Sequence, residues 1–394
     1  MKDSIDFGSM EIPKLFRKLL IPTVLGMVFS AVFVITDGIF VGRGIGSDAL
    51  AAVNITAPLF LISTGVGLMF GVGASVVASI HLAQGKVKAA RINVTQAVAV
   101  SSLLLAAYSF LITSCAREVA LLLGSSERLL PLAVEYMHWF APFLPFSALL
   151  SSGMFFIRLD GSPNYAMLCN AVPAVINIVL DPVFIFAFGL GARGAAIATV
   201  LSQLASCVYA VRFLLGQKPP IRITRGGYSA AVMRRVLTLG FSPFIIIALD
   251  NVMIIAMNAV LQHYGGAARG DALVTCATIA QSFMLVVTMP LGGITGGTQS
   301  ILSYNYGAYR TERVRQAQKY IFGLGLVFTA VMTLAARLAG PLFVRLFTTD
   351  EALAAQAFDT IKVCTLALLP LGLQYEVVDG FTALGLAKLA LPLS

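Results

Sequence analysis

The sequence predicts an all-α membrane protein of two parallel six-helix repeats around a central cavity, with the second repeat cut to about four helices. Hydrophobic residues make up 58% of the 394 positions and charged residues 11%, whereas a soluble domain carries about 25% charged residues. The apolar residues fall into ten runs, each long enough for the ~20 residues that a membrane-spanning helix needs. Landmarks of the first half also recur in the second half.

Six of the apolar runs lie in the first half of the chain and four in the second. Several exceed the minimum length, so we expect tilted spans or spans that extend beyond the hydrocarbon. Residues 1–13 are polar and lack the short apolar core and small-residue cleavage site of a signal peptide, so the first run should be retained. The runs lie near residues 14–41, 50–80, 92–115, 130–157, 164–188, 193–215, 235–262, 272–302, 317–339 and 353–384.

The duplication follows from matched landmarks offset by 221 to 224 residues. Six spans is an even number, so both repeats start on the same side of the membrane and are parallel rather than inverted. At this offset Ser394 corresponds to Asn170, early in the fifth span, so we expect most of an eleventh span and a twelfth to be missing. The matched landmarks are Pro22, Asp48-Ala49-Leu50, Gly73, Gly85 and Gly161 with Pro243, Asp271-Ala272-Leu273, Gly296, Gly307 and Gly385.

The longest polar stretch between spans divides the chain into lobes. Residues 216–234 contain Gln217-Lys218-Pro219-Pro220 and Arg225-Gly226-Gly227, which are typical of a loop. We therefore predict an N-terminal six-helix lobe over 1–215, a cytoplasmic loop over 216–234 and an incomplete C-terminal lobe over 235–394.

The net charge of +9 reflects membrane topology rather than nucleic-acid binding. With a cytoplasmic N-terminus, about 19 of the 27 basic residues fall on the cytoplasmic side, which is the positive-inside imbalance of membrane proteins. The sequence thus predicts a multi-pass protein of the bacterial plasma (inner) membrane, attracted to anionic lipid, with no nucleic-acid partner.

Motifs for enzymatic chemistry are absent. The chain has no HExxH, GxSxG or Walker A sequence, so ATP does not power it and neither a metal nor a cofactor is predicted. The five cysteines are scattered without CxxC spacing and are interpreted as small hydrophobic residues.

Acidic residues inside the spans are the strongest functional candidates, because an ionisable side chain in hydrocarbon costs several kcal/mol. Asp37, Asp181 and Thr199 lie on three different spans, each roughly 7 to 10 Å from the outer membrane surface. Asn177 lies one helical turn from Asp181, on the same face. These oxygens suit Na⁺, and two neighbouring carboxylates also suit a proton, because their like charges repel each other. The alternative is that each Asp hydrogen-bonds a carbonyl freed by a kink.

The second half does not repeat this group of residues. Asn258 occupies the position matching Asp37, and the match to Asp181 falls beyond the end of the chain. Asp250 lies near the middle of the seventh span, as a substrate counter-charge, a second cation ligand or a structural residue. Glu376 and Asp379 lie in the inner part of the tenth span, as part of the same second site or as solvated groups.

These features together resemble the multidrug and toxic compound extrusion (MATE) family of cation-coupled antiporters, in its DinF-type prokaryotic branch. The ordered set covers essentially the whole chain. The segments that carry the resemblance are Ile21-Pro22, Thr36-Asp37-Gly38, Gly71-Val72-Gly73, Ala83-Gln84-Gly85-Lys86, Arg158-Leu159-Asp160-Gly161-Ser162-Pro163, Asn177-Ile178-Val179-Leu180-Asp181-Pro182, Gly191-Ala192-Arg193-Gly194, Gly240-Phe241-Ser242-Pro243, Asn305-Tyr306-Gly307 and Ala383-Leu384-Gly385.

The resemblance implies a monomer that exports cationic, often lipophilic, small molecules by alternating access against inward flow of H⁺ or Na⁺. It implies that Asp37, Asn177, Asp181 and Thr199 form the cation site and that the first span bends at Pro22. The acidic pair of the family's NorM-type branch is matched poorly, since Asp250 is about one residue out of register.

Two alternatives remain at this stage. A related flippase or exporter of lipid-linked or polysaccharide substrates would share the apolar spans, but should have more of them and a cavity rich in Arg and Lys. An intramembrane enzyme would need a nucleophile or a metal site, and the sequence shows neither.

Overall fold

The computed structural model describes residues 5–44, 47–123, 125, 127, 129–216, 221–348 and 350–394, and every regular secondary-structure element in these ranges is a helix. Ten segments within these ranges are long and apolar enough to cross a membrane, which confirms the ten predicted spans. The first half contains α1 (Ile12–Gly44), α2 (Ser47–Ala83), α3 (Val87–Ser114), α4 (Ala116–Leu122), α5 (Leu130–Phe140), α6 (Leu144–Leu159), α7 (Pro163–Pro182) and α8 (Gly191–Leu214). The second half contains α9 (Ala230–Gly307), α10 (Thr311–Leu338), α11 (Gly340–Arg345), α12 (Glu351–Cys364), α13 (Leu368–Ala383) and α14 (Ala387–Ala390).

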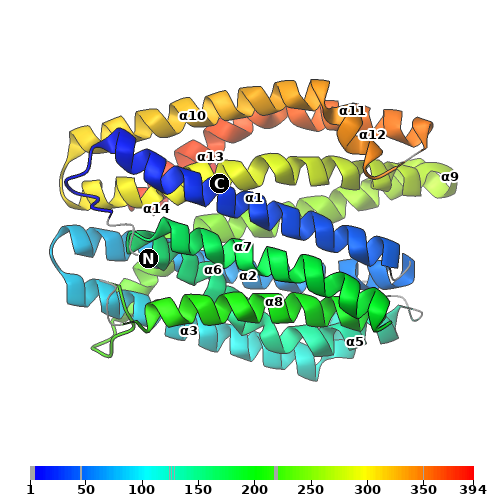
Figure 1. The fold of residues 1–394 in the computed structure, drawn as a ribbon, viewed down its shortest axis with the longest axis horizontal. Helices are drawn as coiled ribbons and strands as arrows, with labels where there is room; N and C mark the ends of the chain where they lie inside the picture. The colour runs from blue at the N-terminus through cyan, green and yellow to red at the C-terminus, as the bar shows by residue number, and fades with distance from the viewer. Residues whose placement is uncertain are drawn as a thin grey trace.

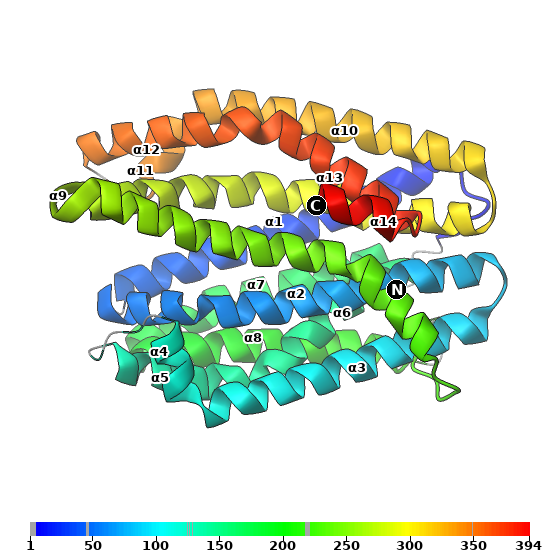
Figure 2. The same ribbon diagram turned by 180° about the vertical axis from the view of Figure 1, so that it is seen from behind.

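The helices form two side-by-side bundles with nearly parallel long axes. Figures 1 and 2 show α2–α8 in one bundle and α9–α14 in the other, and α1 runs along the seam between them. We call these bundles the N-lobe and the C-lobe. The sequence assigned α1 to the N-terminal lobe, whereas the structure places it between the two lobes. The domain bounds and the central cavity stay predictions.

Helix α9 differs from the sequence prediction at its start and at the junction of the seventh and eighth spans. It begins at Ala230, where the Ser229 side chain accepts a hydrogen bond from the Val232 amide, so the expected loop over 216–234 is shorter by one helical turn. The seventh and eighth spans are joined within α9 by a break at Gly266, whose φ is +59°. Only glycine adopts this left-handed conformation readily, so the chain reverses there without a separate loop.

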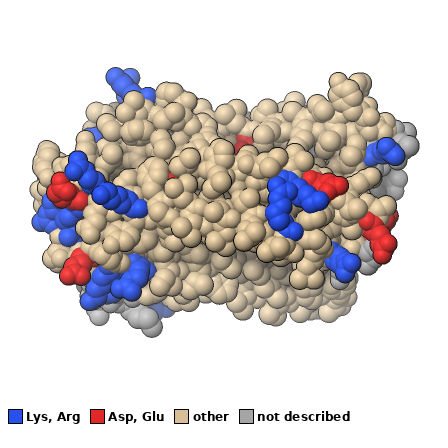
Figure 3. All heavy atoms as spheres, turned by 90° about the horizontal axis from the view of Figure 1, so that it is seen from above, with Lys and Arg blue, Asp and Glu red and all other residues tan. Residues whose placement is uncertain are grey.

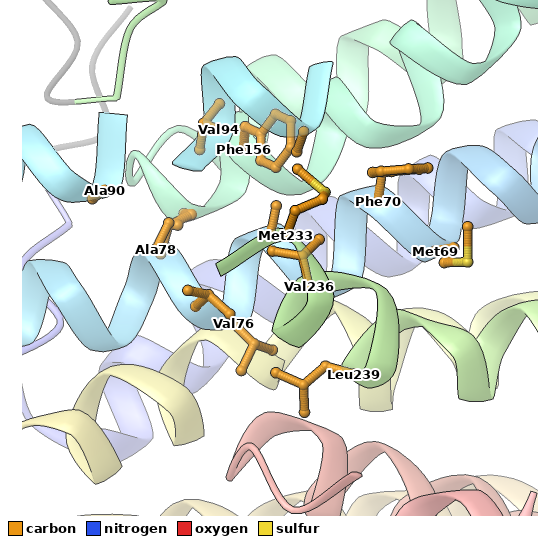
Figure 4. Close-up of a cluster of buried hydrophobic side chains, with 14 of the residues drawn as sticks. Met69, Phe70, Val76, Ala78, Ala90, Val94, Phe156, Met233, Val236 and Leu239 are labelled. Atoms are coloured by element: carbon orange, nitrogen blue, oxygen red, sulfur yellow. The ribbon is translucent and has the colours of Figure 1, made fainter. Parts of the chain in front are cut away.

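The two lobes are in backbone contact where α2 crosses the first turns of α9. A methyl group at Gly73 would overlap the Val236 carbonyl, and one at Gly240 would overlap the Met69 carbonyl. Figure 4 shows the buried apolar cluster around this crossing. Small residues permit such close approach of membrane helices, whose association depends on packing rather than on the hydrophobic effect.

Helix α1 packs against both lobes. Its first turns pack Leu15 and Leu19 into a cluster with Ile301 and Ile321 of the C-lobe. One turn beyond Pro22, Gly26 lies against Asn170 of α7 in the N-lobe. A change in the shape of α1 would therefore act on the packing of both lobes.

The segment before α1 is fastened to the C-lobe. Arg313 donates hydrogen bonds to the backbone carbonyls of Phe7 (3.2 Å) and Met10 (2.6 Å) and to the Asn305 side chain (2.8 Å). The Phe7 ring is buried and lies 5.7 Å from the Tyr304 ring centroid. These contacts hold residues 7–10 against the C-lobe, although the sequence analysis described this segment only as polar.

Charged side chains avoid the middle of the molecule. Figure 3 shows one face on which most Lys, Arg, Asp and Glu gather toward the two ends, with a broad and largely uncharged band between them. Such a band is the surface expected of a protein embedded in hydrocarbon.

Candidate functional site

The four residues predicted from the sequence come together between helix α1 at the seam and helices α7 and α8 of the N-lobe. Asp37 comes from α1, Asn177 and Asp181 come from successive turns of α7, and Thr199 comes from α8. The contacts of α1 with α7 and of α7 with α8 hold these helices side by side. The structure therefore brings the four residues together at one place in the fold. We call these four residues the carboxyl pair site.

The chain around Asp181 has an irregular backbone. Pro182 has no amide hydrogen to donate to the helix, and residues Val183–Ala187 form a π-helical turn. The following turn contains Gly189 and Gly191, with φ values of +63° and +54°. Single π-turns inside helices are frequent at functional sites because they free or re-aim polar groups.

The polar side chains of the site are hydrogen-bonded to one another. Asn177 Nδ2 donates to Asp181 Oδ1 at 3.0 Å, and Thr199 Oγ1 donates to Asp37 Oδ1 at 3.4 Å. The Asp37 carboxyl also lies within hydrogen-bonding reach of Asp181 and Asn177. Asn177 and Asp181 are fully buried, whereas Asp37 is half-buried.

Two acceptor oxygens of the site have no donor. Asn177 Oδ1 and Asp181 Oδ2 are buried, and no hydrogen-bond donor among the described residues reaches either. A buried acceptor without a donor costs about 1–3 kcal/mol. A proton or a small cation bound between the two carboxyl groups would supply the missing partner, so the geometry suits reversible cation binding.

Tyr136 of α5 is a member of this site that the sequence did not reveal. Its ring is stacked with Phe140 at a centroid distance of 5.7 Å, and its hydroxyl is close enough to interact electrostatically with Asp37 and Asp181. A tyrosine in an apolar run gives no signal of its own, because aromatic residues are common in membrane helices.

Two acidic residues of the C-lobe lie near one aromatic side chain. Asp250 of α9 and Asp379 of α13 both interact electrostatically with Tyr375. Asp379 is also within hydrogen-bonding reach of the Thr295 hydroxyl, whereas the Asp250 side chain is exposed. These two carboxylates are grouped with each other and not with the carboxyl pair site.

Glu376 corrects the expectation of a solvated group in the inner part of the tenth span. Its side chain is only 1% exposed and packs against Gly325 of α10, which has no side chain to occupy that space. Neither carboxyl oxygen of Glu376 has a hydrogen-bond donor among the described residues. Solvation is excluded because α13 turns this residue toward α10 rather than toward the end of the lobe.

Two further sequence landmarks are placed as follows. Pro22 lies inside α1, which continues as a helix through it. Asn258, the counterpart of Asp37, lies in α9, but its side chain is outside the described residues.

Comparison with known proteins identifies relatives over nearly the whole chain. The multidrug export protein MepA of Staphylococcus aureus strain NCTC 8325 is 25% identical over 384 residues, covering 96% of this chain and 83% of the relative. A protein of Shewanella oneidensis named FAD transporter is 26% identical over 382 residues, covering 95% of this chain and 82% of that protein.

Solved structures share the fold. A multidrug resistance MATE family transporter in an outward-facing conformation superposes with a TM-score of 0.90, and a Pyrococcus furiosus transporter of the MOP superfamily with 0.88. Each is 22% identical and covers 97% of this chain and 85% of the other. The family model MatE matches residues 22–183 and 244–391. The chain is therefore a member of the MATE family of multi-pass multidrug efflux transporters, and not an enzyme.

Proposed function

We propose that this protein is a cation-coupled antiporter that exports cationic, lipophilic compounds by alternating access, and that the carboxyl pair site binds the coupling cation. The observation that carries the proposal is the pair of neighbouring carboxyl groups from α1 and α7, with Asp181 Oδ2 buried and without a donor. An ionisable group inside a membrane-spanning segment is a functional candidate by default.

We favour a proton as the coupling ion. Two carboxyl groups within hydrogen-bonding reach repel each other when both are ionised, and a shared proton removes that repulsion. Na⁺ would instead keep both groups ionised and recruit the neutral oxygens of Asn177 and Thr199. Because the two groups interact strongly, the proton belongs to the pair rather than to either residue.

The position of the pair on α1 and α7 links cation binding to lobe packing. Asp37 lies on the helix that contacts both lobes, and Asp181 lies on a helix of the N-lobe. Occupation of the pair would favour one arrangement of α1 against α7, and Pro22 is the point where α1 lacks a backbone hydrogen bond and bends most easily. A cation can shift a two-state equilibrium only by its difference in affinity for the two states.

The acidic residues of the C-lobe support a cationic cargo. Asp250 and Asp379 are near Tyr375, so a cation bound there would meet two carboxylates and an aromatic ring. Aromatic faces attract organic cations. An anionic cargo, such as the one in the name of the Shewanella oneidensis relative, would be repelled by the same carboxylates. Glu376 belongs to this proposal as a second cation site.

We place the protein in the DinF-type branch, in the bacterial inner membrane with a cytoplasmic N-terminus. The N-lobe residues match that branch, and the basic residues predict the orientation.

The test is efflux from proteoliposomes under imposed gradients. A cationic dye such as ethidium should be exported under a proton gradient at a rate that is unchanged when Na⁺ is replaced by K⁺. Transport that survives dissipation of the proton gradient and requires Na⁺ would overturn the choice of ion. Faster export of FAD than of ethidium would overturn the choice of cargo.

The second site is tested by Glu376→Gln. Because the carboxyl oxygens have no donors, the amide should leave the free energy of unfolding unchanged or slightly raise it. If Glu376 binds a coupling proton, the variant should also lose part of the proton-driven efflux. Normal efflux by a folded variant would remove Glu376 from the mechanism.

A further inference from the structure

The first turns of α1 carry a row of basic side chains that continues as an apolar row. Lys14, Arg17, Lys18 and Ile21 follow the spacing of one helical face. The same face continues through exposed Leu25, Val28 and Val32. The basic part lies at the end of the molecule where α2 joins α3 and α9 joins α10 (Figure 2).

A cavity of about 400 Å³ lies beside the basic part of this row. Its walls come from three places in the chain: the segment before α1, the first turns of α1 and the start of α7. The volume falls within the ~300–1,000 Å³ range of small-molecule sites, which suits a lipid headgroup rather than a whole lipid. The lining residues are Ile5, Lys14, Arg17, Lys18, Ile21, Pro22 and Asn164.

The three cations at the cavity have no ion-pair partner among the residues that the structure describes. These cations are Lys14, Arg17 and Lys18. The Asp6 carboxylate does not line the cavity and accepts hydrogen bonds from the Gly8 amide (2.8 Å) and the Ser9 hydroxyl (2.6 Å). Glu11 precedes the row and is exposed, without an ion pair to it. The cavity therefore has a net positive wall.

We propose that this cavity binds the phosphate-bearing headgroup of an anionic phospholipid of the adjacent leaflet, with its acyl chains lying along Ile21, Leu25, Val28 and Val32. A guanidinium and two ammonium groups carry charge opposite to that of a phosphodiester and supply hydrogen-bond donors for its oxygens. The apolar continuation of the same helical face excludes a purely soluble anion as the best occupant, because it supplies a surface for hydrocarbon directly next to the charge.

Pro22 gives this site a consequence for transport. It lines the cavity and lies on the helix that contacts both lobes. A bound headgroup would therefore act on the turn of α1 that bends most easily, independently of which cation the carboxyl pair site takes.

The experiment uses a tryptophan reporter at the cavity. Trp139 is the single tryptophan of the chain, so W139F with I21W leaves one indole, at a residue that is 57% exposed. In nanodiscs, quenching by brominated phosphatidylglycerol is compared with quenching by brominated phosphatidylcholine. A basic side chain near an anionic surface raises local affinity about five-fold, so three additive contributions should give a preference for phosphatidylglycerol on the order of a hundred-fold.

The matched variants separate this site from general surface charge. K14Q/R17Q/K18Q should lose the preference. K88Q/R225Q/R234Q removes the same charge from exposed residues at the same end and should keep it. Thermal unfolding of both triple variants checks that each is folded, which exposed positions should permit.

Three results would overturn the proposal. An equal loss of the phosphatidylglycerol preference in both triple variants would show that only the general surface potential attracts the lipid. Displacement of the brominated lipid by excess soluble glycerol phosphate would show a site for free phosphate. Equal quenching by the two lipids in the unmodified reporter would show that no headgroup is preferred.

Discussion

Replacing Asp181 tests both the chemistry and the packing of the carboxyl pair site. Asp181→Asn keeps the size of the side chain and the oxygen that accepts from Asn177 Nδ2. It also replaces the oxygen that has no donor by an amide that can donate toward Asp37. The variant therefore retains the hydrogen bonds of the site while removing the group that binds the cation.

The expected change in the free energy of unfolding follows from the number of buried polar groups that each variant leaves without a hydrogen bond. Asp181→Ala leaves the fully buried Asn177 amide without its acceptor, which costs about 1–3 kcal/mol, and it adds a small cavity. Asp181→Asn has neither cost and removes a buried like charge next to Asp37, so its free energy of unfolding should equal or exceed that of the wild type. The two variants should thus differ by at least about 1 kcal/mol, although both lose proton-coupled efflux.

The assay combines two readouts on the same preparations. Ethidium efflux from proteoliposomes is measured under an imposed proton gradient, and unfolding is measured in detergent with increasing denaturant. Asp359→Asn is the matched control, because its carboxylate is exposed and paired with Lys362 at 2.8 Å. An exposed ion pair contributes about 0–1 kcal/mol, so this variant should transport and unfold like the wild type.

Two outcomes would refute the reasoning. Efflux by Asp181→Asn at the wild-type rate would show that this carboxyl does not couple transport to protons. Asp181→Asn that is as unstable as Asp181→Ala would show that its hydrogen bond to Asn177 does not hold the site together.

The remaining predictions concern the lobe contacts and the N-terminal segment. Gly240→Leu should prevent the close approach of α9 to the Met69 carbonyl, so cross-linking between α2 and α9 and the thermal midpoint should both fall, whereas unchanged cross-linking would argue against this packing. Arg313→Ala removes the hydrogen bonds to the Phe7 and Met10 carbonyls and to the Asn305 side chain, so trypsin should cleave at Lys14 faster than in the wild type. Equal cleavage rates would show that the Phe7 side chain alone holds the segment. The hydrogen bond from the Ser9 hydroxyl and, next, that from the Gly8 amide lower the pKa of Asp6 below its usual value of 3.8. The ionised carboxylate therefore stabilises this turn above pH ~3.8, and the stabilisation is lost as the pH falls through the lowered pKa. Asp6→Asn should speed hydrogen exchange of residues 5–10 at neutral pH and have no effect in acid.

The spans and most of the carboxyl pair site were predictable because their signals are local. A run of about 20 apolar residues can satisfy its backbone in hydrocarbon only as a helix. Asn177 and Asp181 meet because residues four apart share a helical face, and a buried Asp is conspicuous in such a run. The landmarks repeated at offsets of 221 to 224 residues then predicted two lobes.

The contacts between spans were not predictable in the same way. Tyr136 joins the site only because α5 packs beside α8, and its ring looks like any other aromatic residue in the sequence. Glu376 and Asp379 are three residues apart in one helix, yet one is buried against Gly325 and the other reaches Thr295. Which face of a helix meets a neighbour depends on shape complementarity between surfaces that are distant in sequence.

The amino-acid sequence by itself determined that this chain is a helical membrane protein, because hydrogen bonding in hydrocarbon leaves the backbone no alternative. It also determined which carboxylates are costly to bury. Tertiary structure alone decided that α1 contacts both lobes, that α2 and α9 meet at paired glycines, and that basic residues of α1 line a cavity next to Pro22. The physical reason is that apolar helices have no solvent-driven preference for one another in a bilayer, so their arrangement depends on packing across the whole molecule.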